Sequence, residues 1–266
     1  MALSTGTLLL RLLGVLLCMV TARSAAMAFN RLVDARIDAA NPRTADRHLP
    51  AQTPTGVQVW SFWLANVLLF EISCLLFLPN WLPLLFSVPV LAWICGYSFA
   101  KRFTSGAHLW LGIALALSPV CAWIALRGEL VAQQPSDLLP SLLLGAAIAC
   151  WVAGFDIIYA CQDADFDRQS GLHSVPARFG VAGALRISAA FHVAMLLFLG
   201  LFPVACPQFE FGWLALAGLI GVSALVLRQH WLVKPNDLRH VGFAFFQLNA
   251  ILSFGFNACI ALDIWL

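Results

Sequence analysis

The sequence predicts an all-α fold, a polytopic transmembrane helical bundle of eight helices in a single domain over residues 1–266. Composition supports this prediction, because 61% of the residues are hydrophobic and 11% are charged, whereas soluble domains carry roughly 25% charged residues. Mean hydropathy is +0.87. The apolar residues also fall into runs of about 20, the length that an α-helix needs to cross the hydrocarbon of a bilayer.

The first four predicted spans are residues 7–29, 57–78, 81–100 and 107–126. The first runs directly into a charged segment. The second and third are separated by a short loop containing "PNW", and a basic pair follows the third. Each span is expected to be helical, because a backbone exposed to lipid must satisfy its own hydrogen bonds.

The last four predicted spans are residues 138–160, 181–203, 211–229 and 241–262. The fifth leads into a second acidic segment, which the sixth follows, and "CPQFEFG" joins the sixth to the seventh. Tryptophans at positions 60, 63, 81, 110, 231 and 265 lie at span ends, as aromatic residues do at the two faces of a membrane.

The loops alternate in charge. Twelve of the 15 Lys and Arg residues lie in or beside the loops after spans one, three, five and seven. By the positive-inside rule these loops face the cytoplasm, and both termini then lie outside. The charges form no basic surface, so nucleic-acid binding is not expected.

Two segments carry acidic residues at this cytoplasmic face: "NRLVDARIDAANPRTADRHLP" (30–50) and "DIIYACQDADFDRQSGLHSVPARFG" (156–180). Asn30, Asp34 and Asp38 recur every four residues, and so do Asp163 and Asp167, so each set shares one face of a helix. Carboxylates at this spacing repel one another and need a compensating cation. Oxygen ligands of this kind suit Mg²⁺ shared with phosphate oxygens, and neighbouring Arg side chains can pair with the same phosphates. The two segments together predict a Mg²⁺-diphosphate site.

Other interpretations of these charges are a topology signal and an ion gate. A transporter would place its acids near mid-membrane, where only Glu71 and Asp156 are candidates. Glu71 fits either a functional acid or a hydrogen-bonding partner between helices. His192 and Asn249 are expected to be hydrogen-bonded between helices.

The two motifs, N30-x3-D34-x3-D38 with "NPRTADRHLP" and "YACQD" with D163-x3-D167-x3-G171, resemble those of the UbiA superfamily of intramembrane aromatic prenyltransferases, and "GYSFAKRF" resembles a further cytoplasmic loop of that family. The resemblance covers the chain from about residue 20 onward. It implies Mg²⁺-dependent transfer of a polyprenyl group from an allylic diphosphate to an aromatic acid, with no protein partner. It also implies an integral protein of the bacterial inner membrane.

The resemblance also implies roles for individual residues. Asp34, Asp38, Asp163 and Asp167 match the catalytic metal ligands, and Asn30 is a further possible ligand. Tyr159 lies one helical turn before Asp163, near the allylic carbon. Basic side chains match positions that hold the diphosphate: Arg43, Arg47, Lys101 and Arg102.

The sequence departs from the family at two places. Arg31 stands where many members have a second acidic residue, and this Arg is typical of the branch acting on 4-hydroxybenzoate or, in a menaquinone route, on dihydroxynaphthoate. The first motif also arrives after one predicted span instead of two, because members usually have nine helices. We therefore expect either a misassigned start or a true loss of the first helix, which would leave a non-catalytic member as an alternative.

Overall fold

The computed structural model describes residues 5–45 and 55–266. Their long elements are all helices, and eight of these are long and apolar enough to span a membrane, which confirms the predicted all-α class and the count of spans. The main helices are α1 (Thr5–Ala40), α2 (Gly56–Cys74), α3 (Leu82–Ala100), α4 (Ala107–Gln133), α5 (Leu139–Ala160), α6 (Ala164–Gln169), α7 (Val175–Ala205), α8 (Trp213–Leu232), α9 (Val241–Phe243) and α10 (Asn249–Trp265).

The helices extend beyond the apolar runs at several ends. α1 continues to Ala40, and α4 continues to Gln133, although the predicted spans end at 29 and 126. Hydropathy marks where lipid contact ends, whereas a helix continues until its backbone meets a breaking residue. For α1 that residue is Pro42, because proline disfavours helical geometry in the residue before it.

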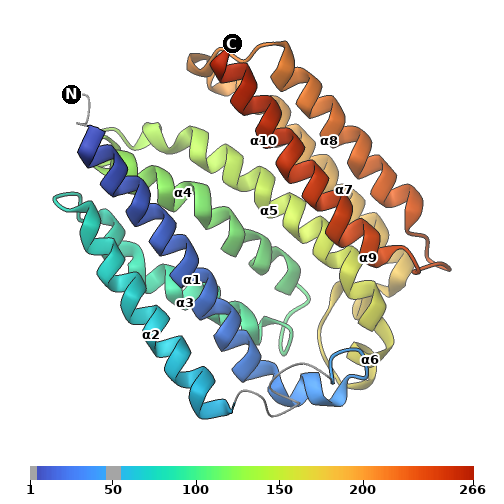
Figure 1. Ribbon diagram of the computed structural model, residues 1–266. Helices are drawn as coiled ribbons and strands as arrows, with labels where there is room; N and C mark the ends of the chain where they lie inside the picture. The colour runs from blue at the N-terminus through green and yellow to red at the C-terminus, as the bar shows by residue number, and fades with distance from the viewer. Residues whose placement is uncertain (1–4, 46–54) are drawn as a thin grey trace. The chain divides into compact units, whose positions relative to one another are not determined.

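The chain divides into two compact units, Met1–Phe99 with Leu117–Leu138, and Ala100–Ala116 with Leu139–Leu266. In the first unit α1 runs alongside α2 (Figure 1). The buried apolar side chains that pack together in this unit include Phe70, Cys74 and Leu91. Polar contacts tie the ends together: the Arg11 guanidinium donates to the Leu126 carbonyl at 3.0 Å, and the Asn80 amide donates to the Ile124 carbonyl at 2.8 Å.

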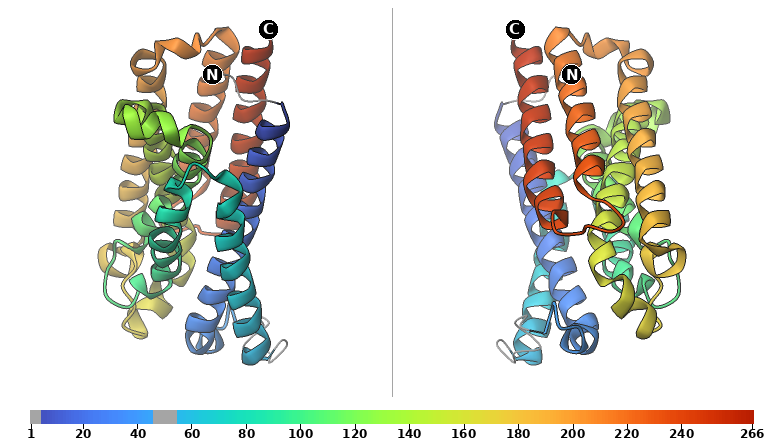
Figure 2. Two further views of the ribbon diagram at one scale, coloured as in Figure 1. Left: turned by 90° about the vertical axis from the view of Figure 1, so that its left-hand side faces the viewer. Right: turned by 90° about the vertical axis from the view of Figure 1, so that its right-hand side faces the viewer.

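In the second unit α5 packs against α7, and α8 against α10, as the right-hand view of Figure 2 shows for the latter pair. A core of buried side chains joins the four helices: Ala147, Met195, Val222, Val226 and Leu252. Gly154 of α5 allows close approach of α7, because a Cβ there would overlap the His192 ring. The Ser188 hydroxyl donates to the Gly154 carbonyl at 2.7 Å.

The intramembrane polar residues have partners within their own unit. His192 Nδ1 lies 2.8 Å from His230 Nε2, and Asn249 bonds to Trp151 and Gln229, which confirms both as hydrogen-bonded between helices. Glu71 accepts a hydrogen bond from the Ser87 hydroxyl at 2.7 Å, so this acid of α2 has a partner on α3.

Candidate active site

The first motif lies on the last three turns of α1, in the first unit. Because α1 continues to Ala40, Asn30, Asp34 and Asp38 do lie at four-residue intervals on one helix, as predicted. The Asp34 and Asp38 residues are 4% and 5% exposed. Carboxylates buried to this degree need charged or hydrogen-bonding partners, and the neighbouring side chains supply them.

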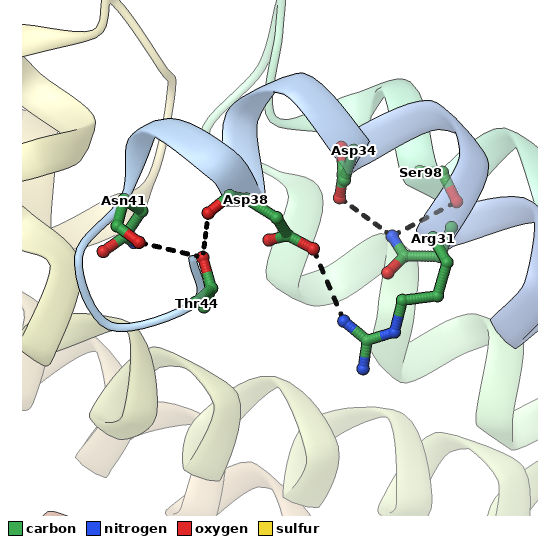
Figure 3. Close-up of polar contacts among 7 residues, drawn as sticks. Arg31, Asp34, Asp38, Asn41, Thr44 and Ser98 are labelled. Atoms are coloured by element: carbon green, nitrogen blue, oxygen red, sulfur yellow. Dashed lines mark hydrogen bonds and ion pairs between the residues drawn. The ribbon is translucent and has the colours of Figure 1, made fainter. Parts of the chain in front are cut away.

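Two contacts organise these acids (Figure 3). The Asn30 amide donates to Asp34 Oδ2 at 3.0 Å and to the Ser98 hydroxyl of α3 at 3.4 Å. Arg31 Nη1 lies 3.4 Å from Asp38 Oδ2, which makes an ion pair. The arginine at the position of the family's second acid therefore neutralises a motif carboxylate.

The residues after α1 fold back on its end. The Thr44 hydroxyl donates to the Asp38 carbonyl at 2.9 Å (Figure 3), and the Arg43 amide donates to the Asn41 side chain at 3.0 Å. This turn satisfies helix-terminal groups that α1 leaves without partners, and it places exposed Arg43 within a few residues of Asp38. The predicted diphosphate ligand Arg47 lies outside the described residues.

The second motif lies in the second unit, where the chain changes from an α-helix to a 3₁₀ turn and back to an α-helix. α5 ends at Ala160, a 3₁₀ turn spans Cys161–Asp163, and the short α6 follows. Gly171 has φ +67°, a left-handed conformation that glycine adopts without strain and that ends helices. The chain then reverses direction into α7, and Ser174 is the N-cap residue of that helix.

The reversal brings the cap of α7 back to the motif. The Ser174 hydroxyl hydrogen-bonds Asp167, and Asp163, Lys101 and His108 all interact electrostatically with that carboxylate. The structure therefore brings together three of the predicted site residues: Asp163, Asp167 and Lys101. Arg102, next in sequence, is exposed.

Hydrogen bonds of two histidine residues stabilise this arrangement. The His173 amide donates to the Lys101 carbonyl at 2.7 Å. The Val175 amide donates to His108 Nε2 at 3.3 Å, so the ring proton is on Nδ1, which lies 2.7 Å from Asp156 Oδ2. Sequence reasoning missed His108, because its partners are 48 and 67 residues away in the chain.

Tyr159 lies on the last turn of α5, one turn before Asp163, as predicted. Its ring packs against that of Phe245, with 4.2 Å between the ring centroids and 33° between the ring planes. This contact also lay beyond sequence reasoning, because "FAFFQLN" offers several aromatic residues and its helical register is irregular.

The donor atoms present fit Mg²⁺ bound together with phosphate. Each unit by itself holds a pair of carboxylates four residues apart; Arg31 and Arg43 are cations of the first unit, and Lys101 is one of the second. Residues 5–45 and 55–266 contain no group of three His, Cys, Asp or Glu side chains that forms a metal cage by itself. Mg²⁺ does not require one, because it is commonly held by one or two carboxylates together with substrate phosphates and water.

Residues 1–251 match the model of the UbiA prenyltransferase family. The chain belongs to the UbiA prenyltransferase family. It is therefore an integral membrane protein and a prenyltransferase. The earlier alternative of a transporter is not supported by this membership.

Known members of the UbiA family resemble the chain over nearly all its length. The 4-hydroxybenzoate octaprenyltransferase of Chromohalobacter salexigens is 30% identical over 261 residues, which are 98% of this chain and 81% of that protein. The 4-hydroxybenzoate solanesyltransferase of Synechocystis is 31% identical over 232 residues, 85% of this chain and 73% of that protein. The apo structure of a UbiA homologue from Aeropyrum pernix K1 matches with a TM-score of 0.81 and 30% identity, over 97% of this chain and 96% of that one.

Proposed function

We propose that the chain transfers a polyprenyl group from an allylic diphosphate to an aromatic acid of the 4-hydroxybenzoate type, in quinone biosynthesis. The observation that carries this proposal is the combination of the two carboxylate pairs with near full-length similarity to enzymes named for 4-hydroxybenzoate. Arg31 supports it as well, since an arginine at this position is typical of the benzoate and naphthoate branch of the family.

In this proposal the diphosphate of the donor is held by charge of both signs. Asp34, Asp38, Asp163 and Asp167 hold Mg²⁺, with Asn30 as a further oxygen donor. Bound Mg²⁺ supplies positive charge that stabilises the pyrophosphate leaving group. The basic side chains pair with the remaining phosphate oxygens: Arg43, Arg47, Lys101 and Arg102.

The reaction is an electrophilic substitution on the acceptor ring. The C1–O bond of the donor breaks, and pyrophosphate leaves with the electron pair. A ring carbon of the acceptor then forms the new C–C bond and loses its proton. Surrounding hydrocarbon keeps water from the allylic cation, and in this proposal the Tyr159 ring contacts that end of the donor.

The location of the site follows from the loop charges. The loops that carry both motifs are basic, so we place them in the cytoplasm by the positive-inside rule. The membrane is then the bacterial inner membrane, with the prenyl tail among the apolar helices and the diphosphate at the cytoplasmic surface.

A test of the acceptor uses membranes from cells that express the chain. They are incubated with Mg²⁺, a long-chain prenyl diphosphate and either 4-hydroxybenzoate or 1,4-dihydroxy-2-naphthoate. We expect prenylated product from the benzoate only. Product from the naphthoate alone would move the chain to the menaquinone route, and no product with either acceptor would indicate a non-catalytic member.

A second experiment tests the metal ligands. Asp34→Asn and Asp163→Asn remove one negative charge from each pair and keep the side-chain shape. Loss of a group that stabilises developing charge lowers kcat by about 10²–10³-fold, so we expect the kcat of each variant to fall by a factor of that size. We also expect EDTA to abolish wild-type activity. Asp165→Asn, an exposed residue beside the second motif, is the matched control and should keep full activity. Turnover that persists in EDTA would contradict the metal assignment.

A further inference from the structure

The last membrane span of the second unit is interrupted by one π-helical turn. Residues Ala244–Leu248 are π-helical, between α9 and α10. Single π-helical turns within a helix disturb its hydrogen-bond ladder and occur frequently at functional sites. Two side chains bond directly to this turn: Gln229 Nε2 donates to the Ala244 carbonyl at 3.1 Å, and Asn249 Nδ2 donates to the Phe245 carbonyl at 2.8 Å.

Asn249 is also the point where three helices are linked. Its Oδ1 accepts from Gln229 Nε2 of α8 at 2.7 Å and from Trp151 Nε1 of α5 at 3.1 Å. Gln229 is 0% exposed and Asn249 is 8% exposed. The shape of the π-helical turn is therefore set by buried amides that are held in turn by α5 and α8.

These amides are not explained by stability alone. Gln229 Oε1 is buried and accepts no hydrogen bond from any described residue, and an unsatisfied buried acceptor is unfavourable. An apolar side chain in place of Gln229 would bury no such acceptor, although it would also lose the hydrogen bonds that Gln229 donates to the Ala244 carbonyl and to Asn249. Polar residues at this place instead fix the direction of the turn.

The turn determines where Phe245 lies. Its ring centroid is 4.2 Å from that of Tyr159, at 33° between planes, and 5.3 Å from that of Phe155, at 81°. Phe155 and Tyr159 lie on successive turns of α5, and Asp163 ends the 3₁₀ turn that follows this helix. Phe245 thus completes a rigid aromatic surface that continues from the second motif along the helix.

We propose that Asn249 and Gln229 are positioning residues for prenyl transfer: they hold Phe245 against Tyr159, and this aromatic surface contacts the allylic end of the donor. The inference rests on the proposed function and adds the structure that supports the reacting carbon. Faces of aromatic rings attract cations, and an ordered pair also excludes water from them. When the pair is loosened, water reaches the allylic cation, forms a C–O bond to it and releases a proton, so that prenyl alcohol replaces the prenylated acid.

The experiment measures this partition. Purified protein is incubated with Mg²⁺, geranylgeranyl diphosphate and 4-hydroxybenzoate, and both prenylated acid and geranylgeraniol are quantified. For Asn249→Leu and for Phe245→Leu we expect the ratio of acid to alcohol to fall roughly two- to ten-fold, the factor that corresponds to loss of one aromatic pair. Phe245→Tyr, which keeps the ring, should retain the wild-type ratio.

Asn257→Leu is the matched control for Asn249→Leu. Asn257 lies on the same helix and donates in the same way to the carbonyl four residues earlier, at 2.8 Å, but it is exposed. We expect the wild-type ratio from this variant. Phe245→Leu keeps the inference testable if Asn249→Leu does not fold, because it leaves the amide network intact.

The possible outcomes separate the two proposals. Wild-type protein that yields no prenylated acid overturns the proposed function. Wild-type protein that is active, with Phe245→Leu lowering turnover but leaving the ratio unchanged, overturns this inference alone. A changed ratio in Asn257→Leu equal to that in Asn249→Leu also overturns it, since a general effect of α10 would then explain both.

Discussion

Arg31 modifies the first motif by forming an ion pair with Asp38. The Asp38 and Arg31 side chains are 7% and 35% exposed and lie 3.4 Å apart, so the arginine compensates the charge of a buried carboxylate. The four-residue spacing predicted that Asp38 would share a face with Asp34 and Asn30. It did not predict the ion pair, because residues seven apart approach only when both side chains adopt matching rotamers.

This ion pair leads to a prediction about stability. Arg31→Gln removes this one ion pair from the buried Asp38, which we expect to lower the free energy of unfolding by about 1–2 kcal/mol, between the values for exposed and buried pairs. If Asp38 binds Mg²⁺, adding the metal with inorganic pyrophosphate should reduce the difference from wild type. Thermal unfolding in detergent, with EDTA or with both ligands, measures this.

Arg36→Gln is the control, because Arg36 lies on the same helix and is exposed. It should unfold as wild type does in either condition. An equal loss of stability for Arg31→Gln with and without the ligands would contradict Mg²⁺ binding at Asp38.

The contact of α5 with α7 depends on one glycine of α5. Ser188 and His192 of α7 both lie against Gly154, whose missing side chain leaves room for the imidazole. Sequence analysis located both helices and predicted a hydrogen-bonded His192. It could not identify Gly154 as the contact point, because the sequence does not distinguish it from other glycines of the spans, such as Gly200, whose Cβ position has nothing within 4 Å.

We expect Gly154→Ala to destabilise the protein by about 1–3 kcal/mol, the usual penalty for forcing extra volume into a packed interior. The physical reason is the overlap of the new methyl group with the His192 ring. Gly200→Ala on α7 is the matched control, since nothing lies within 4 Å of its Cβ position and alanine favours helix. Its thermal stability should equal or exceed that of wild type.

The double variant tests the stated cause. In Gly154→Ala with His192→Ala the overlap is gone, so the combined loss should be smaller than the sum of the two single losses. Simple additivity of the unfolding free energies would show that the methyl group acts elsewhere.

At the scale of the whole molecule, the arrangement of spans and loops follows from hydropathy and charge. The eight predicted spans are confirmed within residues 5–45 and 55–266. The loops at the two ends of α8 are predicted to lie on opposite sides of the membrane. Asn236 lies in a basic loop and Gln208 in one with no Lys or Arg, and both are exposed. The side of the membrane is a prediction from these charges.

A labelling experiment tests this orientation. Asn236→Cys and Gln208→Cys are each treated with a membrane-impermeant maleimide in intact spheroplasts, and the unsubstituted protein reports labelling of the native thiols. We expect only Gln208→Cys to gain label in spheroplasts, and Asn236→Cys to gain it after the membrane is opened. The reverse pattern would place both motifs outside the cytoplasm.

Composition, hydropathy and residue spacing were enough to predict the membrane-embedded helical class, the eight spans and the positions of both acidic motifs. These depend on local properties: the hydrocarbon thickness sets the span length, and helical periodicity sets which residues share a face. The partners of the polar groups became known from the three-dimensional packing, such as His108 with Asp156, Arg31 with Asp38, and Asn249 with the π-helical turn beside Tyr159. Those contacts depend on the packing and rotamers of side chains, which hydropathy and spacing do not encode, and the contact of His108 with Asp156 joins residues 48 positions apart in the chain.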